Sequence, residues 1–296
     1  MGCRNTSHFF VLYILIIKQY VIIIMEEINE QTVSRGLNSN PVYQQQKSYP
    51  FPTEVISLPS KGLVYPENSP LAKGEITVKL MTAKEEDILT STNLIRKGIV
   101  IDKLLESIIV EPGVSLSDLL IGDKNAILIA TRVLAYGPEY DVTVTDPGEN
   151  EPVQTKVDMS KLSIKEVDET LLNRQNEYQF TLPQSKTSIK FKLLTHGDEI
   201  AINKDVEAFE KTLKEGKEVT TRLRRLILEV DGNRDLGFIS NFVVNQLRAA
   251  DSRALRKYIQ KITPDIDLTF EYQSPFTGEK EALRVPIGLD FFYPTD

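Results

Sequence analysis

Hydrophobic and polar positions predict a first set of elements from residue 54 onwards. The chain alternates at Val55-Ile56-Ser57-Leu58, turns at Pro59-Ser60-Lys61-Gly62, and resumes as a strand at Glu75–Met81. Thr82, with Glu85 three residues later, has the sequence of a capping box and predicts a helix through about Asn93. Two more helices and a β-hairpin are predicted to follow: Val100–Val110, Ser115–Ala135, and strands Tyr140–Thr145 and Val153–Met159.

The same order of predicted elements then recurs in the second half of the chain. Two strands are predicted at Glu177–Leu182 and Ser188–Leu194, and a closing hairpin at Ile266–Tyr272 and Glu281–Pro286. The helices predicted between them are Asp198–Lys214, Glu218–Glu229, Leu236–Leu247 and Asp251–Lys261. Each set reads as hairpin, helices, hairpin, so the predicted fold class is α+β.

Local sequence likeness supports an internal duplication. Leu58-Pro59 in the first set resembles Leu182-Pro183 in the second. Asp251 lies 128 residues after Asp123, and the same spacing places Ser274 on Asp146. A period this long favours duplicated domains over a solenoid. We therefore expect two similar units, at residues 54–170 and 171–296.

The first 53 residues differ from the rest. Residues 1–24 are an apolar extension, broken by Lys18-Gln19, and residues 25–53 form a polar arm that is predicted to be disordered. The extension is short for a membrane span, and Met1-Gly2-Cys3 fits a loose lipidation pattern. Three interpretations stay open: an upstream start codon before a true start at Met25, a membrane anchor, or a lipidated targeting segment.

Composition narrows the function classes. The chain has 296 residues, 41% hydrophobic and 26% charged, as expected for globular domains. A net charge of −7 argues against nucleic acid as a partner. A single cysteine, Cys3, excludes an internal disulfide framework.

Candidates for catalysis are few. Beyond the arm there is one histidine, His196, which we interpret as a solvated residue at a helix cap. Glu85, Glu86 and Asp198 lie in predicted first helical turns, where the helix dipole favours acidic residues. No glycine-rich phosphate loop occurs. We expect no catalytic site, no cofactor and no small-molecule substrate.

Basic residues concentrate in the second set. Arg222-Leu223-Arg224-Arg225 is followed by Arg248, Arg253, Arg256 and Lys257. In an acidic chain, such a cluster indicates either solvated helix faces or a seat for an acidic protein partner. Arg222 and Arg225 are the candidate contacts.

The two hairpin turns have the skeleton of a zinc knuckle without its cysteines. A zinc ribbon places Cys-Pro-x-Cys-Gly in a tight turn. Here the turns carry hydroxyls and carboxylates in those places, or are plain proline turns: Asp146, Pro147 and Glu149 in the first, and Ser274, Pro275, Thr277 and Gly278 in the second.

The chain ends in an aromatic cluster, Phe291-Phe292-Tyr293. Such a cluster is buried either on its own domain or in a partner. One interpretation packs Phe291 and Tyr293 on the core with Phe292 facing away, and the other makes Phe292 an anchor in an interface.

Several motifs resemble the baseplate hub proteins of T4-type tailed phages, over about residues 54–294. They are Leu58-Pro59-Ser60-Lys61-Gly62, Met81-Thr82-Ala83-Lys84-Glu85-Glu86-Asp87, Tyr136-Gly137-Pro138-Glu139-Tyr140 and Phe291-Phe292-Tyr293-Pro294. The resemblance implies a non-enzymatic structural or assembly role in the host cytoplasm or the tail baseplate, with other hub and tail proteins as partners. Its members often carry cysteine pairs at the two turns. The alternatives are a membrane-anchored adaptor that uses residues 1–24 and a carboxylate-dependent enzyme.

We expect the globular part to bind no zinc, because hydroxyls and carboxylates at the turns are weaker zinc ligands than thiolates. Metal analysis of protein that begins at Met25 should find much less than one zinc per chain. One zinc per chain that resists a chelator would contradict this.

Overall fold

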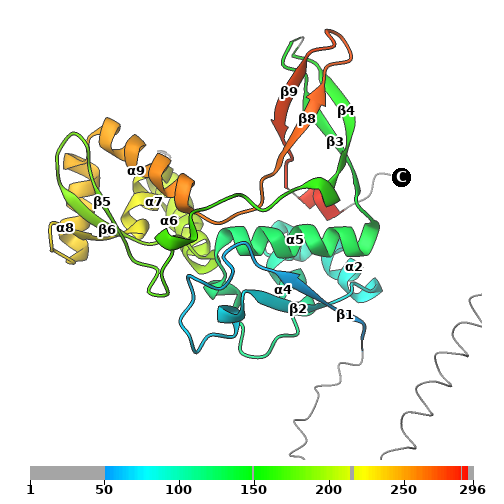
Figure 1. The fold of residues 1–296 in the computed structure, drawn as a ribbon, viewed down its shortest axis with the longest axis horizontal. Helices are drawn as coiled ribbons and strands as arrows, with labels where there is room; N and C mark the ends of the chain where they lie inside the picture. The colour runs from blue at the N-terminus through cyan, green and yellow to red at the C-terminus, as the bar shows by residue number, and fades with distance from the viewer. Residues whose placement is uncertain (1–50, 149, 214–216, 288, 293–296) are drawn as a thin grey trace, which may run out of the picture. The chain divides into compact units, whose positions relative to one another are not determined.

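The computed structural model describes residues 51–148, 150–213, 217–287 and 289–292 (Figure 1). The apolar extension 1–24 and the arm up to residue 50 lie outside the described residues. The fold is α+β, with helices and small antiparallel sheets, which confirms the predicted class.

The first half begins with an antiparallel pair, β1 (Thr53–Ser57) and β2 (Glu75–Lys79). Helices lead from it to a second antiparallel pair. In order they are α2 (Ala83–Thr90), α3 (Thr92–Arg96), α4 (Val100–Ile108), α5 (Ile121–Tyr136), β3 (Glu139–Thr145) and β4 (Pro152–Asp158). Short 3₁₀ turns, Pro70–Lys73, Leu116–Asp118, Met159–Lys161 and Glu169–Leu171, lie in the connections.

The second half contains a three-stranded sheet in the order β5-β6-β7 and a closing antiparallel pair. Its elements are β5 (Tyr178–Thr181), β6 (Ser188–Phe191), α6 (His196–Leu213), α7 (Glu218–Leu226), β7 (Ile227–Val230), α8 (Leu236–Asn241), α9 (Ala249–Ile262), β8 (Thr269–Gln273) and β9 (Lys280–Arg284). A π-helical turn, Phe242–Gln246, extends α8, and a 3₁₀ turn, Leu289–Phe292, follows β9.

Two of the predicted helices are shorter than expected because residues at one end pair with other segments of the chain instead. The helix predicted from Ser115 begins at Ile121, since the Leu119 carbonyl accepts from the His196 backbone N–H and Leu120 bridges Thr195. The helix predicted through Glu229 ends at Leu226, since the chain continues as strand β7, in which Ile227, Glu229 and Val230 pair with β6. Local patterns do not reveal such pairing.

A lysine on the preceding segment reinforces the helix starts at α2 and α6. The Glu85 carboxylate accepts from Lys79 Nζ at 2.7 Å and from the Thr82 N–H at 2.9 Å, which completes the predicted capping box. Burial opposes its ionisation, but hydrogen bonds from Lys79, Ser107 and Thr82 outweigh burial and lower the pKa of Glu85 to about 2. Asp198 likewise accepts from Lys192 and Thr195.

A buried aspartate near the start of α5 holds the loop between β1 and β2. Another, near the start of α9, holds the loop between β5 and β6. Asp123 is fully buried and accepts from the Ser60 N–H, the Ser60 hydroxyl and the Tyr65 hydroxyl. Asp251, also fully buried, accepts from the backbone N–H groups of Gln184 and Ser185 at 2.7 and 3.0 Å. In each half, one carboxylate therefore fixes the turn of the opening strand pair against a helix.

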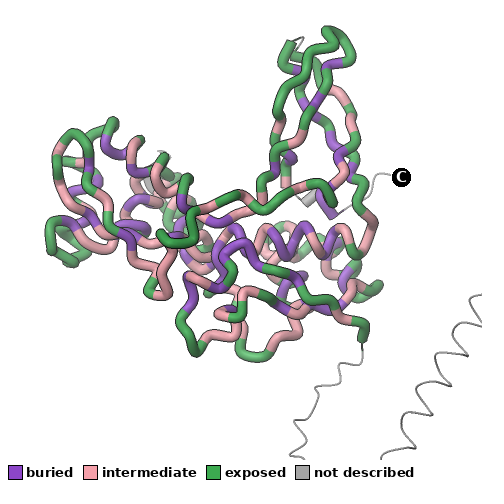
Figure 2. Tube along the Cα trace, viewed as in Figure 1, coloured by how far each residue is buried: buried purple, intermediate pink, exposed green. Residues whose placement is uncertain are grey.

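The two halves contact each other closely within one compact unit, residues 49–296. Buried residues line α5 and continue into the base of the strand pairs (Figure 2). Gly122 of α5 lies so near the Pro264 carbonyl that an added Cβ would come within 2.0 Å of it. The β3–β4 and β8–β9 pairs lie side by side, and the Tyr272 hydroxyl donates to Asp146 at 2.8 Å (Figure 1).

Replacing Asp123→Ala is expected to lower the free energy of unfolding by about 3 kcal/mol, because it leaves buried donors of Ser60 and Tyr65 without an acceptor. Denaturant unfolding measures the change. Asp118→Ala, at an exposed aspartate close to the same helix start, is the matched control. Equal stability of the two variants would contradict the structural role of Asp123.

Candidate protein-interaction site

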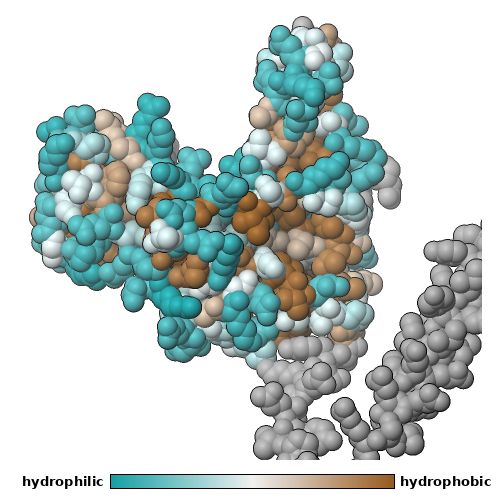
Figure 3. Space-filling model, viewed as in Figure 1, coloured by the Kyte–Doolittle hydropathy of each residue, from teal (hydrophilic) through white to brown (hydrophobic). Residues whose placement is uncertain are grey.

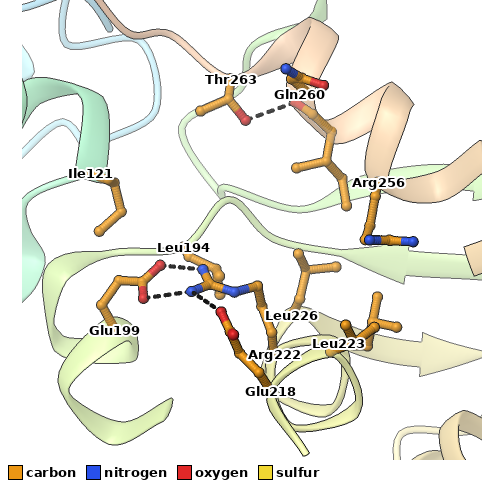
Figure 4. Close-up of a pocket in the computed structure, with 12 residues that line it drawn as sticks. Ile121, Leu194, Glu199, Glu218, Arg222, Leu223, Leu226, Arg256, Gln260 and Thr263 are labelled. Atoms are coloured by element: carbon orange, nitrogen blue, oxygen red, sulfur yellow. Dashed lines mark hydrogen bonds and ion pairs between the residues drawn. The ribbon is translucent and has the colours of Figure 1, made fainter. Parts of the chain in front are cut away.

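A groove between α7 and α9 is the main candidate for contact with another molecule (Figure 4). Its cavity volume is about 400 Å³. The spacing of residues along each helix brings the lining side chains to one face. Val219, Leu223 and Leu226 share one face of α7 and form one wall. Arg256 and Ile259 share one face of α9 and form the other. The remaining lining is Ile121, Leu194, Glu199, Glu218, Arg222, Gln260 and Thr263. The groove is thus an apolar floor with a polar rim.

The predicted contact residues Arg222 and Arg225 are held by carboxylates of this chain. The guanidinium of Arg222 forms a two-point pair with Glu199, one bond being 3.0 Å, and Glu218 lies 3.9 Å away (Figure 4). Arg225 lies 3.7 Å from Asp205. Both arginines are partly exposed and each is paired with a carboxylate, so neither is a free positive charge; of the two, only Arg222 lines the groove.

The basic side chains of α9 differ from Arg222 and Arg225 in their contacts. Arg253, Arg256 and Lys257 are exposed, share one helix face, and form no ion pair with the described residues. The sequence placed them in the basic cluster, but only the fold shows that Arg256 lines the groove. Ile121 and Leu194 reach the same groove from other elements, and no sequence pattern linked them to it.

His196 is buried, not solvated as the sequence suggested. It is 5% exposed, at the start of α6, where Gly197 packs against Ser117. Its Nε2 lies 2.7 Å from Asp102 and its Nδ1 lies 3.0 Å from Lys124 Nζ. With both ring nitrogens facing charged groups, neither is placed to activate a serine in the manner of a catalytic triad.

Two of the three carboxylates considered for catalysis, Glu85 and Asp198, hold helix starts in place. Acid catalysis near neutral pH needs a carboxyl with a raised pKa, whereas the pKa of Glu85 is lowered. Asp198 accepts from Lys192 Nζ at 2.8 Å. Glu86 is exposed.

The side chains at the two knuckle-like turns cap their own backbone. Asp146 accepts from the Gly148 N–H at 2.9 Å, and Ser274 Oγ accepts from the N–H groups of Phe276 and Thr277 at 3.2 Å. Pro147 and Pro275 follow them, and Gly278 N–H closes the second turn onto the Ser274 carbonyl. Glu149 lies outside the described residues. Within the described ranges, no group of three acidic, histidine or cysteine side chains is placed to hold a metal ion.

The aromatic end of the chain is part of the core. Phe291 and Phe292 are 0% and 1% exposed, and their rings pack edge to face at 5.2 Å. Phe291 also packs on Tyr140, and its carbonyl accepts from Arg132 Nε at 2.9 Å. The structure thus contradicts the expectation that Phe292 faces away from its own core. Tyr293 lies outside the described residues.

Sequence comparison assigns the family. Residues 57–293 match the family described as T4 bacteriophage base plate protein, and the chain belongs to that family. The family indicates a role in the structure or assembly of a phage baseplate, as the motifs predicted. Searches of curated proteins and of solved structures gave no match.

In the described part of the chain, every helix is too short or too polar to span a bilayer.

Replacing Phe292→Ala is expected to lower the free energy of unfolding by about 3 kcal/mol or more, because it opens a cavity beside Phe291. Thermal unfolding of the purified chain measures this. Phe276→Ala, at a 58% exposed aromatic, is the control. An unchanged melting temperature for Phe292→Ala would instead favour the interface interpretation.

Proposed function

We propose that the chain is a non-enzymatic structural or assembly protein of the baseplate hub of a contractile phage tail. It acts through contacts with other hub and tail proteins, in the host cytoplasm during assembly and in the tail baseplate. The family supports the baseplate role, and the motifs that resemble hub proteins support the finer placement.

The observation that carries the proposal is the apolar groove with a charged rim between α7 and α9. Apolar pockets ringed by polar groups are typical of protein contacts. The side chains best suited to acid–base work, Glu85 and His196, are meanwhile engaged by neighbouring residues of the same fold. This favours binding over catalysis.

We also propose that the two halves arose by duplication. Lys79, Thr82 and Glu85 make the same contacts as Lys192, Thr195 and Asp198. The turns at Asp146 and Ser274 close with bonds of the same spacing. An experimental structure tests this: residues 54–162 should superpose on residues 177–292, with the same hairpin topology.

The function is tested in infected cells that lack the phage's own copy of the gene. Without it, electron microscopy should show no complete tails, and supplying residues 25–296 should restore them if Met25 is the true start. A tagged chain should co-purify with tail proteins, and comparison with purified virions shows whether it stays in the particle. Normal tails in its absence, with no tail protein enriched over an untagged control, would refute the proposal.

A further inference from the structure

We propose that the groove between α7 and α9 binds an acidic segment of another tail protein. Apolar side chains of that segment enter the groove, and its carboxylates face Arg253, Arg256 and Lys257 of α9. The inference rests on the proposed function and names the chemistry of the partner.

The groove floor supplies the apolar part of the contact. Leu223 and Leu226 are buried below it, Leu194 and Ile259 are half-buried, and Val219 is 49% exposed at its edge. The volume of about 400 Å³ is within the range of about 300–1,000 Å³ found for ligand pockets. Covering these side chains removes apolar surface from water and so favours an occupant with apolar side chains.

The two wall helices supply the charge. Helix α7 carries three arginines against one glutamate, and α9 carries four cations against one aspartate, which is buried and bonded to backbone N–H groups. The whole chain, by contrast, has a net charge of −7. On α7, Arg222 and Arg225 already face carboxylates. The cations of α9 form no ion pair with any described residue, so they are the part of the surface that an acidic partner would complement.

Other occupants fit less well. A second copy would bring the same positive helices to the contact, and like charges facing each other oppose binding. Nucleic acid would use the cations but would leave the apolar floor without a match, since its affinity comes mainly from phosphate contacts.

A photo-crosslink tests the inference in the full chain. Val219, exposed at the groove edge, is replaced by a benzophenone-bearing residue in infected cells that lack the native copy. Irradiation should join it to a tail protein, and mass spectrometry should map the joined peptide to a segment that is acidic and carries apolar residues.

Charge reversal gives the matched comparison. Arg253→Glu with Arg256→Glu should lower the crosslink yield by about fivefold or more, because attraction becomes repulsion. Arg96→Glu, on the exposed end of α3, reverses an arginine that has no ion pair in the described chain and should leave the yield unchanged. Since these arginines are exposed, circular dichroism should show all variants folded. Arg256→Gln, which removes charge without reversing it, should give an intermediate yield.

A crosslink to a second copy, to nucleic acid or to a basic segment would overturn the inference. So would no crosslink, or a yield that resists charge reversal. If the chain still co-purifies with tail proteins in those cases, the proposed function stands and only the assignment of the groove fails. If no tail protein co-purifies, the proposed function fails as well.

Discussion

The fold depends on burying a carboxylate near the start of its central helix, α5. Asp123 accepts three hydrogen bonds from Ser60 and Tyr65, and the Tyr65 hydroxyl also accepts from the Leu120 N–H. Burial raises the pKa of Asp123, and the hydrogen bonds offset only part of that cost. The carboxylate is therefore tolerable only while the loop stays in place, which couples the opening strand pair to α5.

A second buried aspartate links the fold to the candidate site. Asp251 fixes the start of α9 against the loop at Gln184 and Ser185. Helix α9 then forms one wall of the groove, and Ile121, two residues before Asp123, reaches its floor. Figure 3 shows hydrophobic residues gathered around α5, while hydrophilic residues cover most of the rest of this face. Two buried aspartates thus position the groove without lining it.

Sequence patterns could predict the elements whose causes are local. The capping box at Thr82 and the turns at Asp146 and Ser274 form as expected, because each is closed by side chains within a few residues. The start of α5 and the strand β7 could not be predicted, because their backbone bonds go to Thr195, His196 and β6. The basic cluster was visible in the sequence, but only the fold separates the arginines that pair with a carboxylate from those that form no ion pair with the described residues.

The contact between Arg132 and Phe291 affects the order in which the core forms during synthesis. Arg132 donates to the carbonyls of Gly137, Glu139 and Phe291, so its last partner is synthesised 159 residues after it. At about 5–20 residues per second, a ribosome takes roughly 8–30 s to cover that distance. During this interval Tyr140 and the neighbouring face of α5 lack their aromatic cover. The nascent chain therefore emerges with unburied apolar surface, and Phe291 and Phe292 complete packing that began in its first half.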